Sequence, residues 1–198
     1  MKDAGILFLI TLVAGLLLGG VYQITKEPIA LQKEKARTLA MQEVFQDAAS
    51  FEEMSAFSEA DVQEILNQGG FEGASVNSCA VAADAAGSSL GYVITVTTHE
   101  GYAGDIQFTL GIRNDGTLNG MSILSINETP GLGMNAEDVL KPQFANKKVD
   151  RFVVTKTGAA AEDQIDAISS ATFTTDAITD GVNAGLYYFA EELKGGIE

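Results

Sequence analysis

A cluster of hydroxyl side chains precedes the last helix-forming segment of the chain. Five Ser and Thr residues fall within positions 169–175, shortly after Asp166. Unpaired N–H groups and the helix dipole make a helix N-terminus favourable for an anion, and hydroxyl groups add hydrogen bonds to a phosphate. The same run could instead be an elaborate N-cap, with Thr174 or Thr175 capping a helix over residues 177–193. The residue types alone leave both a phosphate site and a structural cap open.

A second segment, residues 127–133, reads Asn-Glu-Thr-Pro-Gly-Leu-Gly. Pro130 and Gly131 favour a turn and Gly133 adds backbone freedom, so these residues are also typical of a plain loop. The residue types alone therefore do not assign a function to this segment. A functional interpretation needs a second observation that links it to the hydroxyl cluster.

Composition excludes several other chemistries. With 12 basic and 27 acidic residues the formal net charge is -15, which argues against binding to nucleic-acid phosphates. The single cysteine, Cys79, excludes an internal disulfide, a cysteine-rich zinc site and an iron–sulfur cluster held by this chain. His99 is the only histidine, so neither a metal site nor a Ser–His hydrolase is expected. Apolar residues make up 46% of the chain, enough for a packed core.

The elements that would position these segments are strands followed by a helix. Period-two patterns predict strands over residues 75–82, 91–98, 106–113, 118–126 and 149–155. Asn114-Asp115-Gly116 is a hairpin signal between two of them, because glycine accepts the positive φ of a tight turn. A short helix over 59–67 is expected to begin at Ser58 and end at Gly69-Gly70, and Gly195-Gly196 to end the last helix. We therefore expect an α+β domain with an antiparallel sheet.

The N-terminal segment, residues 4–25, carries no charge. As a helix it would rise about 33 Å, which matches a hydrocarbon core about 30 Å thick. The alternative, a cleaved signal peptide, usually has a shorter apolar region. Residues 28–48 follow Pro28 with helical spacing and predict a continuing amphipathic stalk. Gly15 and Gly19 form a GxxxG pattern that could mark a helix–helix contact or arise by chance.

Both segments resemble motifs of the FMN-binding domain family. The run Asp166-Ala-Ile-Ser-Ser-Ala-Thr172 resembles its flavinylation motif Asp-x-x-(Ser/Thr)-Gly-Ala-Thr, and Glu128–Gly133 resembles its second signature. Gly101-Tyr102-x-Gly104 and the pattern over 115–120 fit its hairpin, so the resemblance covers about residues 90–190. Ser170 replaces the commoner glycine, a mild change if φ is negative there and a strained one if φ is positive.

The resemblance implies FMN attached covalently through a phosphoester bond to Thr172. It places the flavin ring beside Thr129, Leu132 and Gly133, with Glu128 either accepting a hydrogen bond from the cofactor or bracing the loop. Lys156 resembles a basic position that would neutralise phosphate or stabilise reduced flavin, although a solvated lysine is equally compatible with the sequence. The full set of implied cofactor-binding residues is Thr172, Asp166, Ser169, Ser170, Ala171, Thr174, Glu128, Thr129, Gly131, Leu132, Gly133 and Lys156. None is expected to act as an acid, base or nucleophile in turnover.

Within this family, the G subunits of Rnf ferredoxin:NAD oxidoreductase complexes are the most similar group. That resemblance implies a transmembrane helix over 1–27, a helical stalk and linker over 28–70 and an FMN-binding domain over 71–198. It further implies an electron carrier on the extracytoplasmic side, matured by a flavin transferase. Its expected partners are iron–sulfur membrane subunits and the flavinylated membrane protein that forms the D subunit of the complex. The complex would export sodium ions or protons.

The residues alone leave open the orientation of the domain across the membrane and the function of the protein. Lys26, Lys33, Lys35 and Arg37 follow the apolar segment and by charge alone favour a cytoplasmic domain, against the family's orientation. A flavin-free assembly protein of a membrane complex and a stand-alone extracytoplasmic flavoprotein are the alternative functions.

Overall fold

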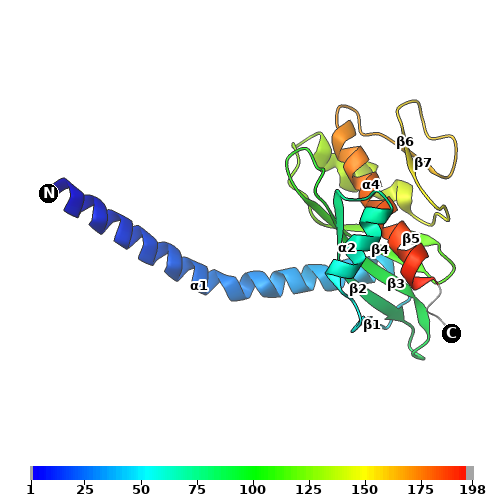
Figure 1. Cartoon of the computed structure of the whole chain (residues 1–198), viewed down its shortest axis with the longest axis horizontal. Helices are drawn as coiled ribbons and strands as arrows, with labels where there is room; N and C mark the ends of the chain where they lie inside the picture. Colours follow the sequence, from blue (N-terminus) through cyan, green and yellow to red (C-terminus); the bar gives the residue numbers. More distant parts are fainter. Residues whose placement is uncertain (1, 195–198) are drawn as a thin grey trace. The chain divides into compact units, whose positions relative to one another are not determined.

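A computed structural model describes residues 2–194 of the chain (Figure 1). It contains two compact units, Met1–Leu39 and Ala40–Glu198. The division of the chain at residues 27 and 70 stays a prediction, whereas the second compact unit begins at Ala40.

The first unit is part of helix α1 (Lys2–Val44). Pro28 lies inside this helix and lacks a backbone N–H, yet the helix continues to Val44, as the helix-forming residues after it predict. By length and composition α1 is able to cross a membrane, and none of its most apolar 18-residue window is buried. The helix therefore fits a membrane anchor.

The second unit is built on a five-stranded antiparallel sheet in the order β1-β2-β3-β4-β5. Its strands are β1 (Ser50–Glu53), β2 (Ala74–Ala83), β3 (Ser89–Thr98), β4 (Ile106–Arg113) and β5 (Leu118–Ser125). Consecutive pairing of neighbouring strands confirms the expected antiparallel α+β fold. The predicted turn closes the β4–β5 hairpin, where Gly116 has a φ of 87°.

The helices follow the strands or connect them. They are α2 (Glu59–Gln68), the short α3 (Ala136–Val139) and α4 (Thr172–Tyr188). The 3-10 turns η1 (Gly133–Asn135) and η2 (Lys141–Phe144) flank α3, and the π-helical η3 (Phe189–Leu193) follows α4. Ser58 occupies the predicted N-cap position of α2, but its side chain makes no capping hydrogen bond. The predicted stop at Gly195-Gly196 lies outside the described residues.

The two faces of the sheet bury different partners. On β3, Ile94 and Val96 join the core formed with α2 and α4, whereas Val93 packs with Val44 and Phe45 near the end of α1. This alternation follows from the period of two along a strand. Each fully buried Ile, Leu or Phe contributes about 1.5–3 kcal/mol relative to an exposed one, so burial on both faces stabilises the sheet.

Two glycines allow α4 to lie unusually close to the sheet. A Cβ atom on Gly181 would lie 2.8 Å from Cζ of Phe108, and one on Gly185 would lie 2.4 Å from Cδ1 of Leu110. Both distances are shorter than van der Waals contact, so side chains here would force the helix or the sheet to move. The position of α4, including its N-terminal end, is therefore fixed by packing on β4.

Two expectations about the C-terminal half are wrong. Helix α4 begins at Thr172 and not at residue 177, so Thr174 and Thr175 lie inside its first turn while Ala171 occupies the N-cap position. The strand expected over 149–155 is limited to β6 (Val153–Thr155), which pairs in parallel with β7 (Gln164–Asp166). The period-two pattern over 149–155 extends beyond the three residues that pair, and a three-residue strand offers too few positions for alternation to fix its ends.

A small polar cavity of about 170 Å³ lies beside α4. Its lining includes the carboxyl groups of Glu72, Glu100 and Asp180 and the guanidinium group of Arg151. Burial and then the negative charge of Glu100 raise the pKa of Asp180; Asp176 adds to the rise and Arg151 opposes it. The ionised Asp180 side chain therefore destabilises the folded state.

We predict that Asp180→Asn raises the free energy of unfolding near pH 7. A raised folded-state pKa means that the stability contributed by the protonated group is lost as the pH rises through that pKa. The advantage of Asn should therefore shrink toward about pH 3, below the ordinary Asp pKa of about 3.9, where Asp is largely protonated in both states. Urea unfolding at the two pH values measures this difference, with Asp138→Asn on exposed α3 as the control. An equal gain for Asp180→Asn at both pH values would contradict the prediction.

Candidate functional site

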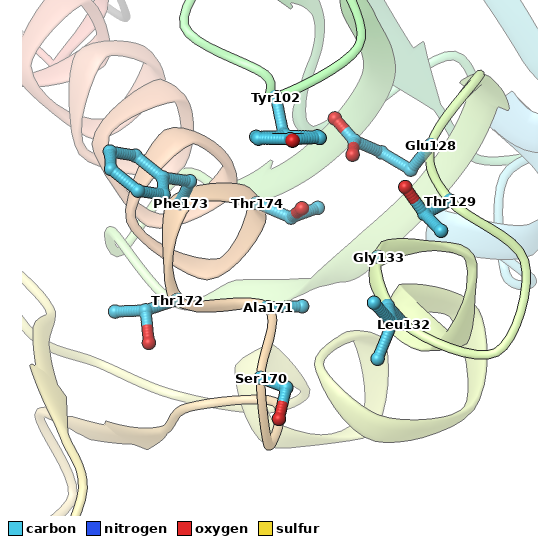
Figure 2. Close-up of a pocket in the computed structure, with 10 residues that line it drawn as sticks. All are labelled: Tyr102, Glu128, Thr129, Leu132, Gly133, Ser170, Ala171, Thr172, Phe173 and Thr174. Carbon is cyan, nitrogen blue, oxygen red and sulfur yellow. The ribbon is translucent and has the colours of Figure 1, made fainter.

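Three segments distant in sequence meet around a cavity of about 360 Å³ in the second unit. They are the β3–β4 loop, the loop after β5 and the first turn of α4 with the two residues before it. The cavity is lined by Tyr102, Glu128, Thr129, Leu132, Gly133, Ser170, Ala171, Thr172, Phe173 and Thr174 (Figure 2). The structure thus brings together the two segments that were singled out separately in the sequence. A volume of this size lies within the range of small-molecule sites.

The approach to α4 is a tight turn secured by Thr175. The Thr175 hydroxyl accepts a hydrogen bond from the Ile168 N–H at 3.1 Å and donates one to the Ala171 carbonyl at 3.0 Å. Ser170, between these residues, has a φ of 64°, in the left-handed region. The strained alternative foreseen for a serine at this position is therefore the one that occurs.

Thr172 is the first residue of α4 and lines the cavity half-buried. The first N–H groups of an α-helix have no acceptor within the helix, so they remain available to an anion. Thr172 and Ser170, two residues with hydroxyl groups, both line this part of the cavity. Thr174, only 2% exposed, lies deeper in the first turn. This end of the cavity can hold a phosphate group.

Glu128 supplies the charge of the cavity. Among the ten described residues that line it, Glu128 is the one Asp, Glu, Lys, Arg or His, and it is only 6% exposed. Its Oε1 atom accepts a hydrogen bond from the Ala103 N–H at 3.3 Å. Among the described residues, no Lys, Arg or His forms an ion pair with it.

Glycines hold the Glu128 side chain at close range. A Cβ atom on Gly133 would lie 2.6 Å from Oγ1 of Thr174 and 2.7 Å from Cβ of Glu128. A Cβ atom on Gly101 would lie 2.9 Å from Oε1 of Glu128 and 2.2 Å from the Gly104 carbonyl oxygen. The 127–133 segment is therefore more than a flexible loop, because position 133 leaves no room for a side chain between Glu128 and Thr174 of α4.

Two aromatic residues at the cavity were missed as site residues in the sequence. Tyr102 and Phe173 each line the cavity and are each 72% exposed. Figure 2 shows Phe173 and Thr172 on one side and Glu128, Thr129 and Leu132 on the other. Aromatic rings favour offset stacking or edge contacts with other flat rings. The sequence did contain a signal for both aromatic residues, because Tyr102 lies within the Gly101–Gly104 pattern and Phe173 directly follows Thr172.

Eight of the twelve residues expected at the site line the cavity, and four do not. Asp166, Ser169, Gly131 and Lys156 are the four outside its lining. Asp166 ends β7, and exposed Lys156 directly follows β6. The Thr155 carbonyl accepts a hydrogen bond from the Ala167 N–H at 2.9 Å, so Lys156 and Asp166 lie at adjacent strand ends.

Two amide side chains anchor the segments that lead into α4. Gln143 accepts a hydrogen bond from the Asp166 N–H at 2.7 Å and donates one to the Asp166 carbonyl at 3.1 Å. Asn183 pairs with the N–H and carbonyl of Phe152 in the same way, at 2.7 and 3.0 Å. No sequence pattern indicated Gln143 or Asn183, because each forms hydrogen bonds with the backbone of a residue that is far away along the chain.

The donor set of the cavity fits FMN. Thr172 and the N-terminus of α4 suit the phosphate group. Apolar or aromatic surface for the flavin ring comes from Leu132, Tyr102 and Phe173. The Glu128 carboxylate can accept hydrogen bonds from N–H or O–H groups of the cofactor. A bound flavin would supply electron-transfer chemistry, while these residues would bind and orient it.

The strain at Ser170 gives a stability prediction. Ser170→Gly should raise the free energy of unfolding by about 1 kcal/mol, because glycine adopts a left-handed φ without the Cβ clash of serine. Asn146, with a φ of 57°, is a matched control outside the cavity. Asparagine tolerates this conformation, so Asn146→Gly should change stability little. Urea unfolding of both variants tests the difference, and a destabilised Ser170→Gly protein would contradict it.

Two family models and one solved structure match parts of the chain. The family model for the FMN-binding domain matches residues 101–187, which include every cavity residue, and the model for the RnfG N-terminal region matches residues 1–44. Among solved structures, NqrC of Shewanella oneidensis aligns with 57% of this chain and 57% of its own, with a TM-score of 0.48 and 20% identity.

Curated relatives match nearly the whole chain. The G subunit of the Na(+)-translocating ferredoxin:NAD(+) oxidoreductase complex of Acetobacterium woodii is 34% identical, with 96% of this chain and 91% of that protein covered. The G subunit of the proton-translocating ferredoxin:NAD(+) oxidoreductase complex of Clostridium ljungdahlii is 30% identical, with 91% and 90% covered. The chain therefore belongs to the RnfG family, the G subunits of Rnf complexes, and contains that family's FMN-binding domain.

Proposed function

We propose that this protein is a membrane-anchored electron-transfer subunit of an ion-translocating ferredoxin:NAD oxidoreductase complex, with FMN bound covalently to Thr172. The observation that carries the proposal is the position of Thr172. It is the threonine of the flavinylation-like motif, the first residue of α4 and part of the wall of the cavity that also contains the Glu128 loop. The Thr172 hydroxyl therefore lies at a helix end that favours an anion and beside a cavity that is large enough for a small molecule.

The attachment needs no catalytic group from this chain. A separate flavin transferase would transfer the FMN moiety of a flavin adenine dinucleotide to Thr172. The Thr172 Oγ1–phosphorus bond would form as the P–O bond of the dinucleotide's pyrophosphate breaks, AMP would leave and the hydroxyl proton would be released, so the protein would gain one FMN less one water. The tether prevents the cofactor from dissociating, which matters for a carrier on the extracytoplasmic side of the membrane. Asp166, Ser169, Gly131 and Lys156 would then support the site from outside the cavity wall.

The anchor and the partners follow from the same family. Helix α1 would hold the domain at the membrane, and the domain would lie on the extracytoplasmic side, as the resemblance implies. Iron–sulfur membrane subunits and the flavinylated D subunit of the complex are the proposed electron-transfer partners. The names of the two relatives differ in the ion, sodium for one and protons for the other, so we propose export of one of these ions by the whole complex.

The first test is the intact mass of the denatured protein produced with its native flavin transferase. We expect a mass gain of one FMN less one water in the wild type and no gain in Thr172→Ala, because the acceptor hydroxyl is then absent. Ser88→Ala is the control: it removes an exposed hydroxyl in the turn between β2 and β3, outside both the motif and the cavity lining, and it should keep the modification.

An unmodified wild-type mass in that host would contradict the covalent carrier and favour a flavin-free assembly protein. Electron transfer without co-purifying membrane subunits would instead favour a stand-alone flavoprotein.

A further inference from the structure

The Glu128 carboxylate has acceptor capacity that the protein does not use. Its Oε1 atom receives one long hydrogen bond, 3.3 Å from the Ala103 nitrogen, and no hydrogen bond to Oε2 occurs among the described residues. An ionised carboxylate only accepts hydrogen bonds. A carboxylate only 6% exposed beside a cavity is costly unless donors or a cation compensate it, so its free oxygen favours a ligand that presents N–H or O–H groups.

The position of this charge is fixed. Gly101 and Gly133 approach Glu128 so closely that a Cβ atom at either position would lie within 2.9 Å of its side chain. Figure 2 shows Glu128 beside Thr129, on the side of the cavity away from Thr172 and Phe173. The Glu128 side chain is therefore packed closely against both loops, and it lies apart from the proposed phosphate end.

The electrostatic consequence concerns the reduced cofactor. Each electron that enters the flavin ring adds negative charge unless a proton follows it. A buried negative charge nearby opposes that addition, and it does so more strongly than in water because the effective dielectric constant is lower. No cation offsets it within the cavity lining of the described residues, since Lys156 is exposed and lies outside that lining.

We propose that Glu128 lowers the reduction potential of the bound flavin through its fixed negative charge, while it accepts a hydrogen bond from the cofactor. The proposal rests on the proposed function, because it requires FMN in this cavity. It makes Glu128 a residue that tunes the carrier toward electron donation, in addition to any bracing of its loop.

The experiment compares midpoint potentials of the FMN-loaded full chain by spectroelectrochemical titration. Glu128→Gln keeps the shape of the side chain and removes its charge, so the midpoint potential should shift to more positive values. Glu162→Gln is the matched control, because Glu162 is exposed in the β6–β7 connection and lies outside the cavity lining. Its potential should stay at the wild-type value. The shift in Glu128→Gln should also persist in high salt, since salt screens buried charges weakly.

A second variant protects the test against poor folding of the first. Glu128→Asp, which retains the charge, should restore a potential closer to that of the wild type than Glu128→Gln does. A purely bracing role would leave the potential of Glu128→Gln at the wild-type value, and that result would overturn the proposal. An unmodified, colourless wild type would overturn the proposed function itself, which the intact mass reveals separately.

Discussion

The close packing of α4 against the sheet is the contact on which the site depends. Gly181 and Gly185 remove the side chains that would otherwise separate the helix from Phe108 and Leu110. A helix held at this distance has its first turn fixed as well, and that turn contains Thr172, Phe173 and Thr174. The chemistry of a helix N-terminus is thus positioned by apolar contacts two to three turns away.

The rest of the cavity is assembled around that helix end by polar contacts with backbone. Gln143 and Asn183 each pair with both backbone groups of a distant residue, which anchors β7 and the segment before β6. Thr175 secures the turn itself from inside the helix. Such buried or half-buried bonds specify one geometry, because each would leave an unpaired polar group if the segment moved.

The charges and dipoles of the protein are distributed unevenly around the cavity proposed for the cofactor. The helix end and hydroxyl groups near Thr172 favour an anion, whereas Glu128 on the other side of the cavity disfavours one. This polarity gives a phosphorylated, flat ligand one preferred orientation, with its phosphate at α4 and its hydrogen-bond donors at Glu128. A protein whose chemistry is electron transfer can use such a fixed field to bind and tune a cofactor without any acid–base residue of its own.

The sequence by itself determined the antiparallel α+β class, the hairpin at Gly116, the continuous apolar helix and the two motifs, because periodicity, turn residues and short spacings are local properties. It did not determine where α4 begins, since Thr174 and Thr175 are good caps in isolation. In the structure Ser170 adopts a left-handed φ and the Thr175 hydroxyl secures the turn from inside the helix, so α4 begins at Thr172. Only the tertiary structure brought Tyr102 and Phe173 to the same cavity, excluded Asp166 and Lys156 from its wall and left Glu128 buried without a cation among the described residues. These outcomes depend on contacts between segments far apart along the chain, whose free energies no local pattern of residues contains.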